Sequence, residues 1–166
     1  MASKEQFAKL FKDEHRAIRD ALLNLIQAFR NRNPAKVRSF LNEVAALSGP
    51  HFRYEEEAFY PALVEVLDEE QVDKLLADHD GAIETARHLS ELAQKDALTE
   101  EDARRGAKYA RNLLPHVFEC DGLSIIAELL PETTMDVVLD VRVRSFGANL
   151  DLLRWAEEAR SRPLGH

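Results

Sequence analysis

Histidine and glutamate occur in this sequence at a spacing that suits the shared binding of a metal ion. His51 and Glu55 stand four residues apart in the stretch HFRYEEEAFYPAL, within a run that otherwise favours a helix. Residues four apart project from the same face of a helix, so both side chains can reach one ligand. Burying them without a partner would cost free energy, because both are polar or charged. The pair therefore points to a buried cation as that partner.

Four of the six histidines follow the apolar stripe of a predicted helix, one on each of four helices: His15, His51, His79 and His116. At a rise of about 1.5 Å per residue, all four are expected about 14 to 16 Å from the same end of a bundle. A single histidine on such a stripe is usually a hydrogen-bonded core residue. Four at one height, with carboxylates nearby, would leave polar groups unsatisfied unless a cation compensates them. The four histidines together therefore predict a metal site.

The fourth-helix stretch HVFECDGL offers further ligands after His116. A straight helix favours Glu119 or Cys120 as the partner of His116. Asp121 is rotated by about 140° from that histidine and reaches the site only if the helix is distorted, which the adjacent Gly122 allows. Nitrogen ligands with bridging carboxylates suit iron, manganese or zinc, and two metal ions fit this number of ligands better than one.

The elements that position these residues are long helices. Apolar residues recur at three- and four-residue steps in four stretches, at about residues 4–31, 34–60, 69–95 and 100–129. The connections between them are short, so that sequential helices are expected to run antiparallel. The predicted fold is all-α, an up-down-up-down four-helix bundle over residues 1–130.

Caps and breaks refine these boundaries. Capping residues are expected at three helix starts: Ser3, Asn33 followed by Pro34, and Thr99 with Asp102. Kinks or ends are expected at three prolines: Pro50, which follows Gly49, then Pro61 and Pro115.

Residues 131–166 form a C-terminal extension of this bundle. The segment VVLDVRV also fits a strand, but helical spacing on both sides favours one or two helices broken near Gly147. These helices are expected to pack on the bundle or to mediate dimerisation, with Trp155 as a packing anchor.

Composition excludes several functional classes. The chain has 166 residues and a net charge of −8, which argues against binding to nucleic acid or to an anionic membrane. No stretch of 18 apolar residues is present to span a bilayer, and the charged N-terminal stretch lacks a signal-peptide core. Cys120 is the single cysteine, so an internal disulfide is excluded. We therefore expect a cytoplasmic protein.

At this point the sequence resembles the hemerythrin-like, HHE cation-binding family over about residues 8–130. The motifs that carry the resemblance are DEHRAIRD, HFRYEEEAFYPAL, LADHDGAI and LLPHVFECD. The resemblance implies a non-heme centre of two iron ions with an oxo or hydroxo bridge. Its ligands would be His15, His51, Glu55, His79 and His116, with a carboxylate from the fourth helix.

Two positions depart from the family pattern. Oxygen-carrying hemerythrins have a second histidine four residues from the third-helix one, where this chain has Leu75 and Ile83. Because this histidine is missing, the iron pair is expected to have an open or water-filled position. The resemblance therefore does not imply stable, reversible oxygen carriage. Many HHE domains also have glutamate where this chain has Cys120, whereas the oxygen carriers have aspartate at the position of Asp121. Asp121 is therefore the expected second bridge, with Glu119 and Cys120 as rivals.

These features predict a di-iron protein that binds or senses dioxygen, nitric oxide or iron, with a small diatomic molecule as its partner. An alternative is a redox enzyme that reduces peroxide or nitric oxide at the same centre, for which the sequence assigns no catalytic residue. Another alternative is a zinc-stabilised interaction module. A homodimer is a further expectation.

Overall fold

A computed structural model describes residues 2–161; Met1 and residues 162–166, which include His166 and the end of the C-terminal extension, lie outside the described part. No strand occurs among residues 2–161, so the all-α prediction is confirmed and the strand alternative for VVLDVRV is wrong. The helices in chain order are α1 (Ser3–Arg30), α2 (Pro34–Tyr54), the π-helix η1 (Glu55–Phe59), α3 (Tyr60–Leu63), α4 (Glu69–Ala93), α5 (Glu100–Asn112), α6 (Leu114–Asp121), α7 (Leu123–Ala127), α8 (Glu132–Ala148) and α9 (Leu152–Glu158).

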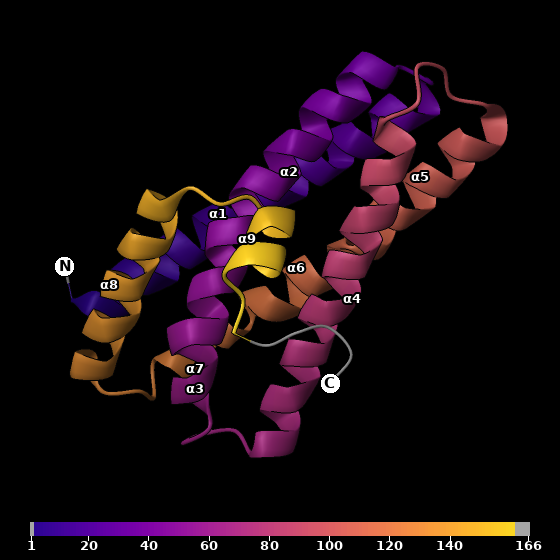
Figure 1. The fold of residues 1–166 in the computed structure, drawn as a ribbon. Helices are drawn as coiled ribbons and strands as arrows, with labels where there is room; N and C mark the ends of the chain where they lie inside the picture. The colour runs from indigo at the N-terminus through magenta and orange to yellow at the C-terminus, as the bar shows by residue number, and fades with distance from the viewer. Residues whose placement is uncertain (1, 162–166) are drawn as a thin grey trace.

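The long helices pack side by side as a bundle (Figure 1). α1 contacts both α2 and α5, and α4 contacts the same two helices. The expected cap at Ser3 is wrong, because Ala2 occupies the cap position and Ser3 is already helical. The Ser3 hydroxyl instead donates to the carboxylate of Asp136 on α8.

The second helical run starts as predicted, with the Asn33 side chain accepting a hydrogen bond from the Lys36 amide. α2 does not end at Pro50 but continues through this buried proline to Tyr54. Irregularity comes later, where the backbone widens into the π-helix η1. Pro61 lies in the short four-residue helix α3, which agrees with the prediction that this proline ends the run or bends it into a short extra turn. Glu55, one of the predicted metal ligands, is the first residue of the π-helix η1.

Capping boxes start the two remaining long helices. Thr99 and Asp102 form the predicted box at the start of α5. Asp68 and Gln71 form another at the start of α4, which the sequence reading did not anticipate. The fourth predicted helix is divided into α5, α6 and α7, with the first break next to Pro115, as expected of a proline.

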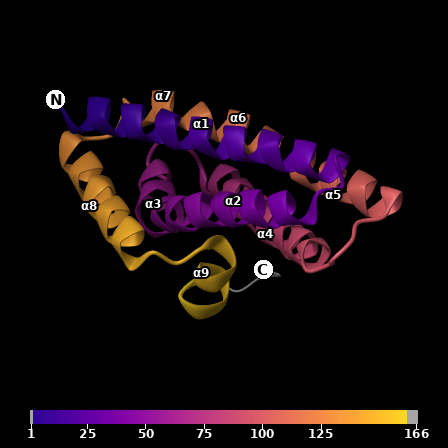
Figure 2. The same ribbon diagram turned by 90° about the horizontal axis from the view of Figure 1, so that it is seen from above.

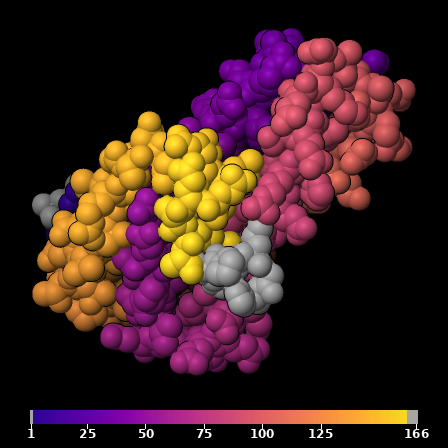
Figure 3. Space-filling view, viewed as in Figure 1, coloured from indigo at the N-terminus to yellow at the C-terminus, as the bar shows by residue number. Residues whose placement is uncertain are grey.

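The C-terminal extension folds as two helices, α8 and α9. The break between them lies at Asn149, whose φ of 52° is left-handed, two residues beyond the predicted Gly147. α8 contacts α1 and α2, and α9 contacts α2 and α4 (Figure 2). In the space-filling view α9 covers the surface between α8 and α4 (Figure 3). Trp155 is buried, as predicted for a packing anchor.

One glycine lets this extension approach the bundle. A Cβ atom at Gly49 would lie 2.3 Å from the Leu150 carbonyl oxygen and 2.7 Å from the Leu152 amide nitrogen. Only glycine therefore allows the backbone before α9 to cross α2 at this distance.

The apolar core is divided along the bundle. One cluster includes Leu22, Leu25, Phe29, Val37 and Leu89. Another includes Phe7, Phe11, Phe59, Leu63 and Met135. His15, His51 and His79 lie between the two clusters on their helices, and His116 lies next to Val117 of the first cluster. Among the described residues, no helix is both long enough and apolar enough to cross a membrane.

Candidate metal centre

Four helices deliver one histidine each to a common layer in the bundle. His15 comes from α1, His51 from α2, His79 from α4 and His116 from α6. The rings of His15 and His51 lie with centroids 4.7 Å apart, and those of His79 and His116 5.0 Å apart. The structure thus brings together the histidines that the spacing predicted at one height.

Glu55 lies between the two histidine pairs and is fully buried. Its Oε1 atom lies 3.2 Å from Nε2 of His51, and its Oε2 atom 3.0 Å from Nε2 of His79. The π turn of η1 starts at this residue, one turn after His51. One carboxylate oxygen therefore faces each histidine pair, which is the arrangement of a bridging ligand.

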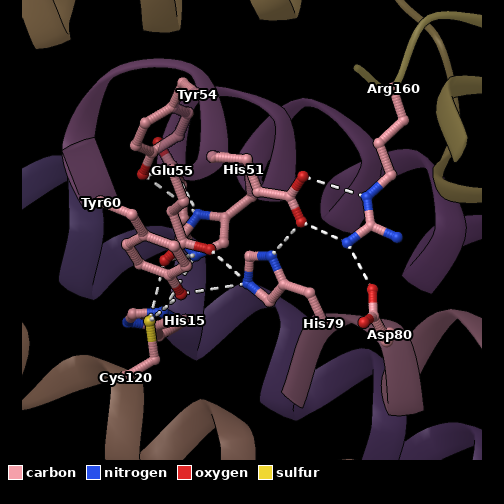
Figure 4. A network of polar contacts seen from close by, with 11 residues as sticks. His15, His51, Tyr54, Glu55, Tyr60, His79, Asp80, Cys120 and Arg160 are labelled. Carbon is pink, nitrogen blue, oxygen red and sulfur yellow. Dashed lines mark hydrogen bonds and ion pairs between the residues drawn. The ribbon is translucent and has the colours of Figure 1, made fainter. Parts of the chain in front are cut away.

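Cys120 completes the constellation. Its thiol donates to Glu55 Oε1 at 2.8 Å and lies 3.8 Å from the Tyr60 hydroxyl (Figure 4). Two groups of ligand atoms result, each with its members within 4.8 Å of one another. The His15 cluster comprises His15, His51, Glu55 and Cys120, and the His79 cluster comprises Glu55, His79 and His116. Because the two share Glu55, they suit a pair of cations rather than a single one.

The residues present fit such cations in their bonding as well as their position. His116 Nε2 is buried without a hydrogen-bond partner among the described residues, and Glu55 Oε2 has only the ion-pair contact with His79 Nε2 at 3.0 Å, without hydrogen-bond geometry. Buried polar atoms of this kind carry a free-energy cost that a cation removes. Imidazole, carboxylate and thiol groups are the donors that iron and zinc prefer.

The other fourth-helix candidates lie outside these clusters. Asp121 Oδ1 is 3.1 Å from Nδ1 of His15, and the Asp121 side chain is 42% exposed. Glu119 is exposed and lines a surface hollow together with His116. α6 stays regular through Asp121 and ends at Gly122. The residue one full turn after His116, Cys120, therefore points to the centre.

Charge is concentrated in the centre. Burial alone would lower the pKa of His51, but the Glu55 and Glu14 carboxylates raise it to about 10. Burial would raise the pKa of Glu55, but His51 and His79 hold it well below its usual range. Burial and the nearby His79 lower the pKa of His116 to about 3. A cation bound here has to displace protons, so binding is coupled to proton release.

Carboxylates outside the two clusters hold the other ring nitrogens of three histidines. Glu14 Oε2 lies 2.6 Å from Nδ1 of His51, and Glu56 Oε1 lies 3.0 Å from Nδ1 of His79. Asp121 holds His15 in the same way. We call Glu14, Glu56 and Asp121 the outer carboxylates. Each imidazole that donates from Nδ1 directs Nε2 to the centre, a pattern common in metal sites.

Two arginines from the C-terminal extension contact the outer carboxylates. Arg142 of α8 donates to Glu14. Arg160, which follows α9, donates to both oxygens of Glu56. It also donates to Asp80 (Figure 4). Sequence reasoning missed Glu14, Glu56 and both arginines. Their one signal was the position of the two glutamates next to His15 and Glu55, and that does not show which histidine each one reaches.

A narrow apolar cavity of about 30 Å³ adjoins the centre. Histidines 15, 51 and 116 form one part of its wall, and apolar side chains such as Ile18, Phe52 and Leu152 form the rest. A cavity needs roughly 10 to 15 Å³ to hold one water molecule, and mostly apolar walls disfavour charged occupants. The cavity therefore suits a neutral molecule of a few atoms.

Comparison with known proteins gives one family. The family model described as "Hemerythrin HHE cation binding domain" matches residues 6–123. That stretch includes every member of both clusters and ends before α8. The search of curated proteins and the search of solved structures gave no match.

Proposed function

The chain belongs to the hemerythrin family of HHE cation-binding domains, and on that premise we propose that it is a non-heme di-iron protein that binds or senses dioxygen, nitric oxide or iron. The observation that carries the proposal is the buried carboxylate of Glu55, shared by two groups of ligand atoms. A helical bundle that buries this much polar chemistry at its centre needs a cation pair to compensate it.

The proposal assigns the ligands by cluster. His15, His51 and Cys120 would hold one ion, His79 and His116 would hold the other, and Glu55 would contribute to both. Iron at these positions supplies reversible one-electron chemistry and affinity for small diatomic molecules. Asp121, expected from the sequence as a second bridge, is assigned to orienting His15, since it contacts Nδ1 of that ring.

The surroundings favour a small neutral ligand. The His79 cluster offers three protein ligands, and α4 has Leu75 and Ile83 where a further histidine would stand. An ion held by these three residues would have room for an external molecule. The adjoining cavity is lined mostly by apolar side chains and disfavours charged species, so that dioxygen and nitric oxide enter more readily than anions do.

A zinc-stabilised interaction module is a second candidate, because the His15 cluster offers four nitrogen, oxygen and sulfur ligands in one place. Four such ligands suit tetrahedral zinc. Peroxide or nitric oxide reduction at an iron pair is a third use of the same residues, and multiple turnover in a peroxide or nitric oxide assay would distinguish it from binding.

Helix order, cellular location and dimerisation are proposed as well. The four long helical runs are proposed to follow up-down-up-down order, as the short connections suggest. The cytoplasm is the proposed location, because it keeps both Fe(II) and the Cys120 thiol reduced. Dimerisation through the C-terminal extension stays a prediction.

Metal analysis tests the proposal. The protein is reconstituted with Fe(II) without oxygen, desalted, and analysed for iron and for its absorption spectrum in both oxidation states. About two iron ions per chain, with near-ultraviolet bands in the oxidised state, are expected. His51→Ala should lose most of the iron, and His88→Ala should retain it, because His88 is a half-buried histidine outside both clusters. A chain that takes up only zinc and shows no spectral response to oxidation would overturn the iron assignment.

A further inference from the structure

The C-terminal extension reaches the ligand histidines through two relays of charged side chains. We propose that Arg142 and Arg160 are positioning residues that set the electron-donating strength of His51 and His79, by acting through Glu14 and Glu56. This inference rests on the proposed function for its iron readout. It gives the extension, which lies beyond the matched residues 6–123, a role in the chemistry of the centre.

The first relay is Arg160 to Glu56 to His79. Arg160 Nη2 donates to Glu56 Oε1 at 2.7 Å, and its Nε donates to Oε2 at 3.0 Å. The Arg160 side chain is 1% exposed and that of Glu56 is 6% exposed. A two-pronged, buried contact of this kind is strong and directional, unlike an ion pair at the surface.

Glu56 transmits this charge to the ligand histidine. Its Oε1 atom accepts from Arg160 and also lies 3.0 Å from Nδ1 of His79. A carboxylate that accepts the Nδ1 hydrogen of an imidazole makes Nε2 a stronger donor to a metal ion. The guanidinium on the same oxygen draws negative charge away from that hydrogen bond. Arg160 therefore limits the donor strength of His79.

The second relay, Arg142 to Glu14 to His51, repeats this arrangement at the other histidine pair. Arg142 Nε contacts Glu14 Oε1, and Glu14 Oε2 lies 2.6 Å from Nδ1 of His51. The Tyr54 hydroxyl also donates to Glu14 Oε2, at 2.7 Å. One ligand histidine in each cluster is thus connected to one arginine of the extension.

The extension is anchored firmly enough to position these arginines. Leu152 and Trp155 of α9 are buried, and the Arg160 guanidinium carbon lies 5.5 Å from the centroid of the Trp155 ring. Arg160 also donates to Asp80 at 2.8 Å, which ties it to the residue that follows His79. The relay is therefore held from both sides.

The two relays predict the direction in which each substitution shifts the reduction potential of the iron centre. Removing Arg160 leaves the charge of Glu56 fully on the His79 hydrogen bond, which favours oxidised iron and lowers the reduction potential. Removing the charge of Glu56 has the opposite effect and raises the potential. General damage to the packing would not separate the two substitutions in this way.

The experiment compares Arg160→Gln, Glu56→Gln and the wild type after Fe(II) reconstitution, by redox titration followed through the absorption spectrum. Arg160→Gln is expected to lower the potential and Glu56→Gln to raise it. Arg160→Lys, which keeps the charge, should restore part of the shift. The matched control is Arg154→Gln, which removes an exposed α9 arginine paired with Glu158 and should leave the potential unchanged. Arg142→Gln and Glu14→Gln test the second relay with the same signs.

A second readout needs no iron. The Nδ1–H proton of His79 in the metal-free protein should move downfield in the NMR spectrum of Arg160→Gln, because its hydrogen bond to Glu56 strengthens, and should not move in Arg154→Gln. If the wild type took up no iron, the proposed function would fail while this resonance still tested the relay. An unchanged resonance in Arg160→Gln, or potentials that shift in the same direction in Arg160→Gln and Glu56→Gln, would overturn the inference.

Discussion

Gly49→Ala is the substitution that tests most directly how the extension is attached to the bundle. The added Cβ would lie 2.3 Å from the Leu150 carbonyl oxygen, 2.5 Å from the Asp151 carbonyl carbon and 2.7 Å from the Leu152 amide nitrogen. These are backbone atoms, which cannot move aside as the end of a flexible side chain can. The segment before α9 has to shift, or α9 has to leave the surface of α2.

The loss of stability can be estimated for both responses, the shift of the segment before α9 and the detachment of α9. Overpacking by one methyl group typically costs about 1 to 3 kcal/mol. If α9 detaches, Leu152 and Trp155 become exposed, and each contributes on the order of 2 to 3 kcal/mol when fully buried. We therefore expect the free energy of unfolding of the metal-free protein to fall by about 2 to 5 kcal/mol, between these two limits.

Urea unfolding followed by circular dichroism measures this change, and hydrogen exchange of α9 shows which response occurs. Gly81→Ala is the matched control, because a Cβ at this exposed α4 position meets nothing within 4 Å. It should stabilise the protein by about 0.5 to 1 kcal/mol, the helix preference of alanine over glycine. Wild-type stability in Gly49→Ala, with α9 amides as protected as before, would refute the reasoning.

Three further predictions concern the centre and its helices. Cys120→Ser should weaken the binding of both Fe(II) and Zn(II) more than Asp121→Asn does. Asp121 only orients His15, so its substitution should lower metal affinity by about 10- to 100-fold. Competition with a chromogenic chelator measures both affinities, and the reverse order would restore Asp121 as a direct ligand. In the metal-free chain the pKa of His51 is raised from 6.5 to about 10, so its contribution to stability is complete below pH 6.5 and is lost as the pH rises toward 10. Urea unfolding between these pH values should therefore show a steeper loss for the wild type than for His51→Gln, and equal slopes would contradict this pKa. Thr99→Ala should lower the free energy of unfolding by about 1 kcal/mol, through loss of the α5 cap, and thermal unfolding with no change from the wild type would show that the cap contributes nothing.

Helices and their histidines were readable from the sequence because both depend on local spacing. The three- and four-residue recurrence of apolar side chains marks a buried helical face, and a histidine on that face must point inward. His51 and Glu55 follow the same rule, since residues four apart share a face. The HHE motifs placed the chain in its family on the same short-range patterns.

The positions of irregularities in the helices were harder to predict from the sequence. The sequence indicated a kink at Pro50 but gave no sign of the π-helix η1, which begins at Glu55, the residue between the two histidine pairs. A regular helix turns Cys120 toward the centre, whereas Asp121 would face it only if the helix were distorted after His116. α6 stays regular until Gly122, and that decided for Cys120.

By itself the sequence determined the all-α fold, the four inward histidines and the partnership of His51 with Glu55, because a helix repeats its geometry every few residues. Only the tertiary structure decided which carboxylates and arginines stand behind those ligands. Arg142 lies 128 residues from Glu14, and Arg160 lies 104 residues from Glu56. No local period links such distant positions, and their contacts exist only because the packing of α8 and α9 against α1, α2 and α4 brings them together.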